Sequence, residues 1–171
     1  LAEEILAQTV IITPGTFLNG LIHIGLNHFP GGRIGEPASI TLSQNFRELG
    51  FNILRFKTGT CSRLDGRTID FRKLQIQEPD KEAAPFSFSN QKIISKQMPC
   101  YITYTNPRTH RIIRLGLSRS PLYTGVIQAT GVRYCPSIED KVVKFSDRNR
   151  HQIFLEPEGR DTSEYYPNGL S

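Results

Sequence analysis

The amino-acid sequence predicts a mixed α/β fold class, and three observations support this prediction. Thr9–Thr13 is a run rich in β-branched residues, which favours a short buried strand. Ser39–Leu49 has the apolar periodicity of a helix, and Phe51–Phe56 after it again favours a strand. A strand, a loop, a helix and a strand in this order are typical of α/β nucleotide-binding folds. At 171 residues the chain fits one domain, or one domain with a lobe inserted in it.

Three glycine-containing turns follow strand-like segments near the start of the chain. They lie at Thr13–Thr16, Gly31–Gly35 and Thr58–Thr60. Such turns expose backbone N–H groups to phosphates and flavin rings, although most of them only reverse the chain. The G-x-G-x-x-G spacing of a dinucleotide fingerprint is absent around Gly31–Gly35. The three turns together favour a dinucleotide cofactor, without specifying which one.

The helix over Ser39–Leu49 is the best-supported helix in the sequence. Its apolar side chains recur at i, i+4 and i+7, as Leu42, Phe46 and Leu49. Ser39 or Ser43 supplies a candidate N-cap, because a serine oxygen accepts from the first free N–H groups of a helix. Gly50 stands where a left-handed residue commonly ends a helix.

Residues 61 to 98 are more polar in composition than the segments on either side of them. Short strands are expected at Thr68–Phe71 and Pro85–Phe88, and a surface loop at Asn90–Lys96. Cys100–Thr105 is rich in β-branched and aromatic residues, which predicts a half-buried strand.

A second helix is predicted from Asn106 as cap and Pro107 as first residue to about Leu117. Its expected inward face consists of Ile112, Ile113 and Leu115, with the arginines pointing outward. His151–Leu155 is the last predicted strand, and the tail Asp161–Ser171 is expected to be a loop.

The formal net charge of +5 is unevenly distributed. Between Asn106 and Ile138 there is no acidic residue, and five arginines lie there: Arg108, Arg111, Arg114, Arg119 and Arg133. A planar guanidinium matches phosphate, so this window predicts a basic surface for nucleic acid or a dinucleotide. The alternative is an ordinary solvated face, and charge alone does not separate the two. A second basic concentration is diluted by Asp65 and Asp70 and consists of Arg55, Lys57, Arg63, Arg67, Arg72 and Lys73.

Cysteine and histidine usage argues against structural metals and disulfides. The three cysteines are far apart and odd in number, and the four histidines are scattered. We therefore expect no metal site and a reducing, cytoplasmic setting. No apolar run approaches the roughly 20 residues of a membrane span, and no signal peptide is evident.

The stretch Gly131–Phe145 places a cysteine between a basic-aromatic pair and an acidic pair. Pro136 suits a first helical turn, and Glu139 and Asp140 suit the positive end of a helix. A thiol before a helix start and beside an arginine favours a thiolate, which makes Cys135 a candidate reactive residue. The stretch alone fits a small buried thiol before an ordinary helix at least as well. Cys61 beside Arg63 is a second candidate, whereas Cys100 is expected to be structural.

Several blocks of the sequence resemble one known family. They are Val10–Leu18, Gly31–Arg33, Lys57–Thr60, Pro99–Thr103, Arg133–Lys141 and Gln152–Gly159. Together they are similar to the MnmG family, also called GidA, and the resemblance extends over essentially the whole chain. It implies part of a glutathione-reductase-like FAD-binding domain with an inserted mixed-sheet lobe. Residues 1–60 would belong to the flavin-domain scaffold, 61–130 to the inserted lobe, and 131–171 to an NAD-binding-like segment that returns to the flavin domain.

The resemblance assigns site residues position by position. Thr13, Gly15, Thr16 and Ser39 would contact FAD, and Cys135 would be the catalytic residue. The nucleic-acid set combines the helix arginines with two residues taken from the resemblance: Arg108, Arg111, Arg114, Arg133 and Lys141. The NAD(H) segment consists of Gly131, Val132, Arg133, Tyr134, Cys135, Pro136, Ser137, Ile138, Glu139, Asp140, Lys141, Val142, Val143, Lys144 and Phe145.

The activity that the resemblance implies is a flavin- and NADH-dependent modification of tRNA. The family attaches an aminomethyl or carboxymethylaminomethyl group to C5 of the wobble uridine, with methylenetetrahydrofolate as carbon donor. Its partners are tRNA and the GTPase MnmE, and its full chain is expected to be a homodimer. The chain would be the central piece of a longer protein, so by itself we expect it to be colourless and inactive. The alternative is a non-catalytic nucleic-acid-binding or assembly module.

Two positions depart from the family pattern. Val132 stands where the family usually has proline, and Cys61-Ser62 stands where Pro-Pro is usual. Neither change removes a charged or reactive residue, so we do not expect a loss of function from them.

Overall fold

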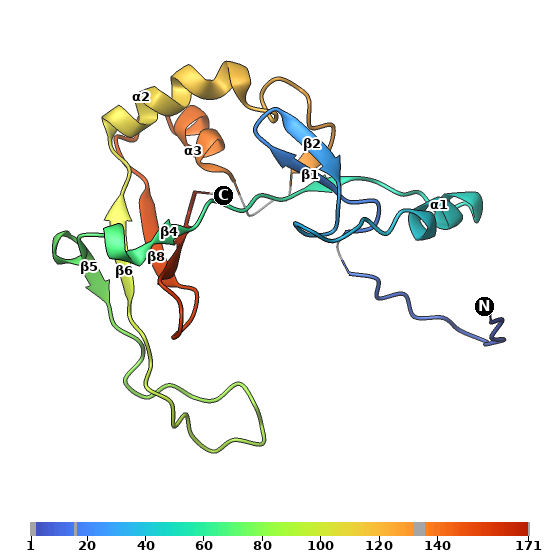
Figure 1. Cartoon of the computed structure of the whole chain (residues 1–171), viewed down its shortest axis with the longest axis horizontal. Coiled ribbons are helices and arrows are strands. Elements are labelled where there is room, and N and C mark those ends of the chain that lie inside the picture. Colours follow the sequence, from blue (N-terminus) through green and yellow to red (C-terminus); the bar gives the residue numbers. More distant parts are fainter. Residues whose placement is uncertain (1–2, 16, 132–135, 171) are drawn as a thin grey trace. The chain divides into compact units, whose positions relative to one another are not determined.

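The structure is a computed structural model that describes residues 3–15, 17–131 and 136–170. The described residues form three α-helices and nine strands, mixed along the chain (Figure 1). The predicted mixed α/β fold class is confirmed. The chain divides into two compact units, Leu1–Arg55 with Arg119–Val126 and Phe56–Ser118 with Ile127–Ser171.

The first unit contains a hairpin and a helix. Strands β1 (Leu21–Ile24) and β2 (Asn27–Pro30) pair antiparallel across a two-residue turn. Gly25 holds that turn with φ +59°, a backbone angle at which residues with a Cβ are disfavoured. Helix α1 (Thr41–Glu48) follows after the glycine loop.

The end of α1 confirms the role predicted for Gly50. Gly50 has φ +89° and donates its N–H to the Arg47 carbonyl at 2.9 Å. The Phe51 N–H reaches back to the Phe46 carbonyl at 2.9 Å, and the two phenyl rings meet edge to face at 5.9 Å. These two bonds with their apolar contact form a Schellman motif, which satisfies carbonyls that the helix end leaves free.

Three expectations for the first 60 residues are wrong. Thr9–Thr13 forms no strand and is exposed, because β-branched residues need a neighbouring strand and none pairs with them in the described chain. The cap of α1 is Ile40 rather than a serine, and Ser43 Oγ donates back to the Ile40 carbonyl at 3.0 Å. The strand expected at Phe51–Phe56 shrinks to β3 (Phe56–Lys57).

The second unit is built on a five-stranded antiparallel sheet. Its strand order is β4-β9-β8-β6-β5, and the bounds are Leu64–Asp65, Glu164–Asn168, Gln152–Pro157, Cys100–Tyr104 and Gln75–Gln77. Helix α2 (Pro107–Gly116) follows β6, and α3 (Ile138–Lys144) precedes β8. A separate parallel pair joins β3 to β7 (Thr130–Gly131). Short 3-10 turns lie at Gly66–Thr68, Phe71–Lys73 and Leu117–Arg119.

The core of this unit lies where the central strands meet. Tyr101 on β6 stands opposite Leu155 on β8, which in turn stands opposite Pro167 on β9. Paired residues share a sheet face, so these side chains lie in one row. The buried apolar residues of the sheet and α3 are Ile102, Val142, Ile153 and Leu155. The rings of Phe71, Tyr101 and Tyr165 meet at 4.5–6.4 Å and extend this packing.

Several element predictions in this unit are confirmed and others are wrong. The strand after Pro99, the Asn106 cap, Pro107 in the first turn and the strand after His151 are confirmed. Thr68–Phe71 and Pro85–Phe88 contain no strand, and β5 forms at Gln75–Gln77 instead. The tail expected to be a loop forms β9, because pairing with both β8 and β4 overrides its turn-like composition.

The inward face predicted for α2 is also wrong. Ile112 and Leu115 are 59% and 74% exposed, and the buried side carries His110 and the half-buried Ile113. A buried histidine with hydrogen-bond partners sets the rotation of this helix, which a purely apolar pattern does not detect.

Candidate functional site

The segment that precedes and forms α3 is the first candidate site. Gly131 ends β7, and Ser137 then caps α3 by accepting from the Asp140 N–H at 3.2 Å. Glu139 and Asp140 occupy the first turn, as the sequence predicts. Pro136 precedes the cap instead of lying in the first turn, which corrects the expected helix start by one or two residues.

Helix α3 is anchored to the turn that follows β9. The Ile138 N–H donates to the Leu170 carbonyl at 3.0 Å, and Lys141 Nζ donates to the Gly169 carbonyl at 2.7 Å. Gly169 has φ +109°, and a Cβ there would meet the Gln152 carbonyl oxygen at 2.9 Å. Val142 is fully buried. The end of the candidate segment that follows Cys135 is therefore fixed against the sheet.

Val132, Arg133, Tyr134 and Cys135 lie outside the described residues, so the role of Cys135 stays a prediction. The two described thiols have structural surroundings. Burial, and then the Glu156 carboxylate, raise the pKa of the Cys100 thiol, which disfavours the reactive thiolate. The Cys61 thiol donates to the Pro167 carbonyl at 3.4 Å and so links the chain before β4 to β9.

The arginine beside Cys61 is committed to other groups. Arg63 Nε donates to Glu158 Oε1 at 2.5 Å, and its Nη1 donates to Thr60 Oγ1 at 2.8 Å. The guanidinium also lies over the Tyr166 ring, 4.5 Å from its centroid. The charge that would favour a Cys61 thiolate is therefore shared with a carboxylate.

The predicted FAD contacts lie in the first unit. Gly15 has φ +76°, and nothing lies within 4 Å of the position that a Cβ would take. Thr13 is exposed, and Thr16 lies outside the described residues. The Ser39 carbonyl accepts the Asn19 N–H at 2.7 Å, which places Ser39 beside the strand-like chain just after this turn.

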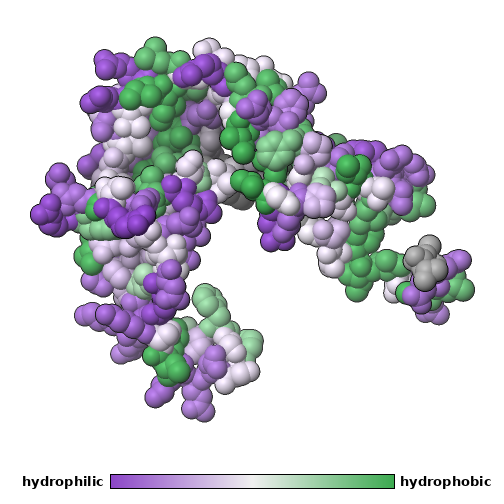
Figure 2. Space-filling view, viewed as in Figure 1, coloured by the Kyte–Doolittle hydropathy of each residue, from purple (hydrophilic) through white to green (hydrophobic). Residues whose placement is uncertain are grey.

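The predicted nucleic-acid face lies on α2. Arg108, Arg111 and Arg114 are all exposed, and none forms an ion pair with a described residue. Arg108 and Arg111 share the outer side of the helix with Ile112 and Leu115, opposite His110. Figure 2 accordingly shows hydrophilic and hydrophobic residues side by side over this helix. Arg133 lies outside the described residues, and Lys141 is held by the Gly169 carbonyl.

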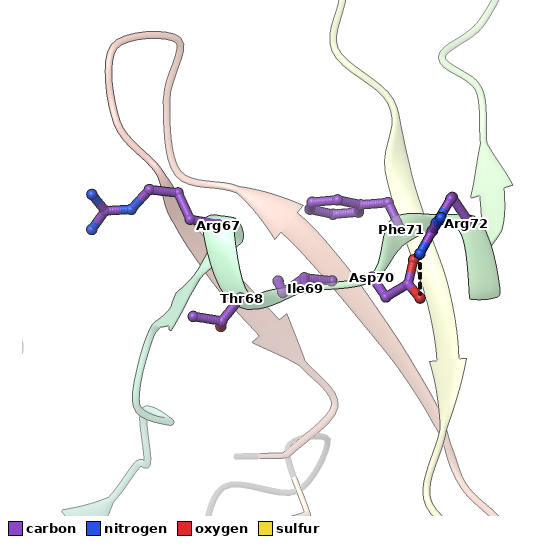
Figure 3. Close-up of a pocket in the computed structure, with 6 residues that line it drawn as sticks. All are labelled: Arg67, Thr68, Ile69, Asp70, Phe71 and Arg72. Carbon is purple, nitrogen blue, oxygen red and sulfur yellow. Dashed lines mark hydrogen bonds and ion pairs between the residues drawn. The ribbon is translucent and has the colours of Figure 1, made fainter.

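The second basic concentration is internally neutralised. Arg67 pairs with Asp65 at 2.7 Å, and Arg72 and Lys73 pair with Asp70 at 2.8 and 3.3 Å. Hydrogen bonds from Arg67 lower the pKa of Asp65 to about 2. A shallow pocket runs along this segment, and in Figure 3 the Arg72 guanidinium bonds to Asp70 while Arg67 points away. These arginines are less available to phosphate than those of α2.

The described residues contain neither a metal-binding cluster nor a membrane-spanning helix. No group of three or more His, Cys, Asp or Glu side chains among them is arranged to hold a metal ion. None of the described helices combines the length and apolar character that a membrane crossing requires.

A buried histidine pair positions α2, and sequence reasoning missed it. His110 on α2 stacks on His151 before β8, with ring centroids 5.1 Å apart. The Thr105 hydroxyl lies 2.8 Å from His110 Nε2 and accepts the His151 N–H at 2.8 Å. All three residues are buried, and His151 Nε2 has no hydrogen-bond partner among the described residues. Forty residues of chain separate the two histidines, so no local sequence pattern predicts their contact.

The histidine pair predicts a pH-dependent stability. Burial, and then the charges of His110, Lys141 and Arg148, lower the pKa of His151. The unfolded chain therefore takes up a proton at higher pH than the folded chain, and stability falls as the pH drops below about 6.5. We expect the melting temperature to fall on acidification, and His151→Phe to weaken that dependence.

Circular-dichroism melting across the pH range measures this effect. His28→Asn changes an exposed histidine outside the pair and serves as the control; its slope should change less than that of His151→Phe, because His28 lowers the pKa of His23 less than burial does. Burial also lowers the pKa of His23, so His151→Phe should leave a residual slope. An unaltered slope in His151→Phe would show that the pair does not titrate during unfolding.

Comparisons with known proteins were made for the whole chain. The family model for glucose inhibited division protein A matches residues 1–171. The chain is 64% identical over 166 residues to the tRNA uridine 5-carboxymethylaminomethyl modification enzyme MnmG of Geobacter metallireducens. It is 63% identical over 166 residues to the protein of the same name from Geobacter sulfurreducens. These alignments cover 97% of this chain but 27% and 26% of the relatives, so the chain spans about a quarter of their length.

A solved structure shares the fold. The form I crystal structure of Aquifex aeolicus GidA superposes with a TM-score of 0.81 at 56% sequence identity. The match covers 93% of this chain and 28% of that one. The form II crystal structure gives a TM-score of 0.78 at 52% identity, over 92% of this chain and 25% of that one.

Proposed function

Because this chain belongs to the glucose inhibited division protein A family, we propose that it is the central part of an enzyme that modifies the wobble uridine of tRNA. The identity of 64% to a relative named as a tRNA uridine 5-carboxymethylaminomethyl modification enzyme carries this proposal. The predicted family resemblance is confirmed. The chain covers 27% of that relative, so the activity is proposed for the whole protein of which this chain would form part.

Within that protein, Thr13, Gly15, Thr16 and Ser39 would hold FAD. The backbone at Gly15 is open, because no atom apart from its chain neighbours lies within 4 Å of the position that a Cβ would take. This open backbone fits a flat cofactor that needs close access to the chain. The segment Gly131–Phe145 would hold NADH. FAD and NADH would supply the redox chemistry, and methylenetetrahydrofolate the carbon. Cys135 would be the catalytic residue of this segment.

The same proposal includes the partners. tRNA would bind the exposed arginines of α2, MnmE would be the GTPase partner, and two copies of the full chain would form a homodimer in the cytoplasm. Large apolar side chains exposed in the first unit, such as Val10, Ile11 and Leu54, support a larger protein that covers them.

The test of the proposed function uses the full-length protein in a strain that lacks it. We expect the protein to restore the C5-modified wobble uridine in tRNA, measured by mass spectrometry of digested nucleosides. tRNA that stays unmodified while the protein is folded and abundant would reject the proposal.

Replacing Arg108, Arg111 and Arg114 together by glutamine is expected to weaken tRNA binding. Each lost phosphate contact should reduce the slope of log K against log salt by about 1, because fewer counterions are released. Fluorescence anisotropy of labelled tRNA at several salt concentrations measures the slope.

The matched control replaces Arg67, Arg72 and Lys73, which removes the same charge from side chains that already form ion pairs. Its effect on the slope should be smaller. Equal slopes for the wild type and the α2 variant would assign the helix to an ordinary solvated face.

A further inference from the structure

The connection between β5 and β6 is a long loop without regular structure, Glu78–Pro99. It continues beyond the ends of both strands (Figure 1). Structureless loops longer than about 12–15 residues are uncommon in compact domains and are usually functional or disordered. This loop therefore requires an explanation beyond connecting two neighbouring strands.

Two phenylalanines in this loop are completely exposed. The relative exposure is 107% for Phe86 and 108% for Phe88. Ser87 lies between them and begins a turn that contains Phe88, in which Ser87 Oγ accepts the Ser89 N–H at 3.2 Å and the Ser87 carbonyl accepts the Asn90 N–H at 3.3 Å. Phe88 is thus presented to solvent from a hydrogen-bonded turn, and Phe86 from the position directly before that turn.

Within the loop the acidic residues, Glu78, Asp80 and Glu82, all precede the two rings, and Lys92 and Lys96 follow them. Between Glu82 and Glu139 the sequence has no acidic residue. Neither lysine forms an ion pair with a described residue. The Arg160 guanidinium from the connection between β8 and β9 donates to the Lys96 carbonyl and adds a third cation. In Figure 2 hydrophobic residues lie among hydrophilic ones over this loop.

We propose that the turn at Phe86–Phe88 stacks on unpaired bases of an RNA, with Lys92, Lys96 and Arg160 contacting its phosphates. Exposed aromatic rings beside cations are the combination that binds single-stranded nucleic acid, because every base offers a flat π-face. The cations that follow the rings, with no acidic residue between Glu82 and Glu139, favour a polyanion over an uncharged apolar protein surface. The inference rests on the proposed function, which makes RNA the substrate, and adds a contact separate from the arginines of α2.

The test uses the absence of tryptophan from the chain. Phe88→Trp gives the chain a single reporter, whose emission is quenched when a base stacks on it. The probes are a labelled stem–loop RNA with an unpaired loop and a labelled duplex RNA of equal charge. We expect the stem–loop to quench the emission, the duplex not to, and anisotropy to report the binding of each RNA independently.

Leu6→Trp is the reporter control, because Leu6 is 90% exposed and lies far from the loop in sequence. Its emission should not change when the stem–loop binds. Replacing Phe86 and Phe88 together by alanine should weaken stem–loop binding at least about fivefold. The salt slope should stay unchanged, because no charge is removed. Ile93→Ala with Ile94→Ala removes apolar side chains from the same loop and should leave the affinity unchanged.

Three outcomes would overturn the inference. The stem–loop could bind without quenching the Phe88→Trp reporter, which would leave RNA binding by α2 intact. Emission could change with protein concentration in the absence of RNA, which would assign the loop to contact with a second copy. A third outcome is that neither RNA binds this chain, which would exclude the loop contact. The proposed function is tested separately, by nucleoside analysis of the full-length protein.

Discussion

Replacement of Cys135 by serine in the full-length protein is expected to abolish wobble-uridine modification while leaving the fold intact. Serine has nearly the shape of cysteine, but its hydroxyl does not ionise near neutral pH and is a far weaker nucleophile. The described residues on both sides fix the ends of this segment, with Gly131 paired in β7 and Ser137 capping α3. Nucleoside mass spectrometry measures the modification, and thermal melting checks the fold.

Cys100→Ser is the matched control for this experiment. Burial raises the pKa of the Cys100 thiol, so that residue is not expected to react, and its variant should retain modified tRNA. Normal modified-nucleoside levels in Cys135→Ser would exclude a chemical role for that thiol. Loss of modification in both variants, with both folded, would show that the assay responds to packing changes.

Thr105→Val is expected to destabilise the second unit by about 2–4 kcal/mol, because it orphans two buried polar groups. The Thr105 hydroxyl accepts the His151 N–H and bonds to His110 Nε2, both at 2.8 Å. Valine fills the same volume but offers neither interaction. Because domains of this size are stable by only about 5–15 kcal/mol, the loss should shift the urea midpoint clearly.

Thr103→Val provides the control on the same strand. Thr103 is half-buried on β6, and valine suits a strand at least as well as threonine. Its urea midpoint should stay close to that of the wild type. If the two variants unfold at the same midpoint, the buried hydroxyl contributes little to the packing of α2.

The sequence predicted those helix ends that are set by residues within or next to the helix itself. The second helix begins at Pro107 because Asn106 accepts from the Thr109 N–H at 2.9 Å, and the first helix ends at Gly50 with its left-handed backbone. Both devices act within one turn of helix and are visible in sequence.

Tertiary partners decided the elements that the sequence did not predict. β9 contains Pro167 and is followed by Gly169, which favours a loop, yet it pairs with β8 and β4. The rotation of α2 follows from His110, whose partners lie at Thr105 and at His151, far along the chain. A hydrophobic pattern counts histidine as polar and therefore turns the helix the wrong way.

The candidate site was predictable to the extent that it is local. The cap at Ser137 and the acidic first turn of α3 follow from the sequence, whereas the contact of Lys141 with the Gly169 carbonyl does not. That contact joins residues 28 positions apart and uses a lysine that the family resemblance assigns to a phosphate. The neutralisation of Arg67 and Arg72 by adjacent aspartates, in contrast, is visible in sequence and is confirmed.

The position of β9 between β4 and β8 has a consequence for how the protein is made. A ribosome releases β4 long before β9, at about 5–20 residues per second. During those several seconds Leu64 and Asp65 have no neighbour on the side that Tyr165 and Glu164 later fill. The sheet can close only when its last strand has left the exit tunnel, so the pairing of β4 with β9 is a late and slow step in the assembly of this unit.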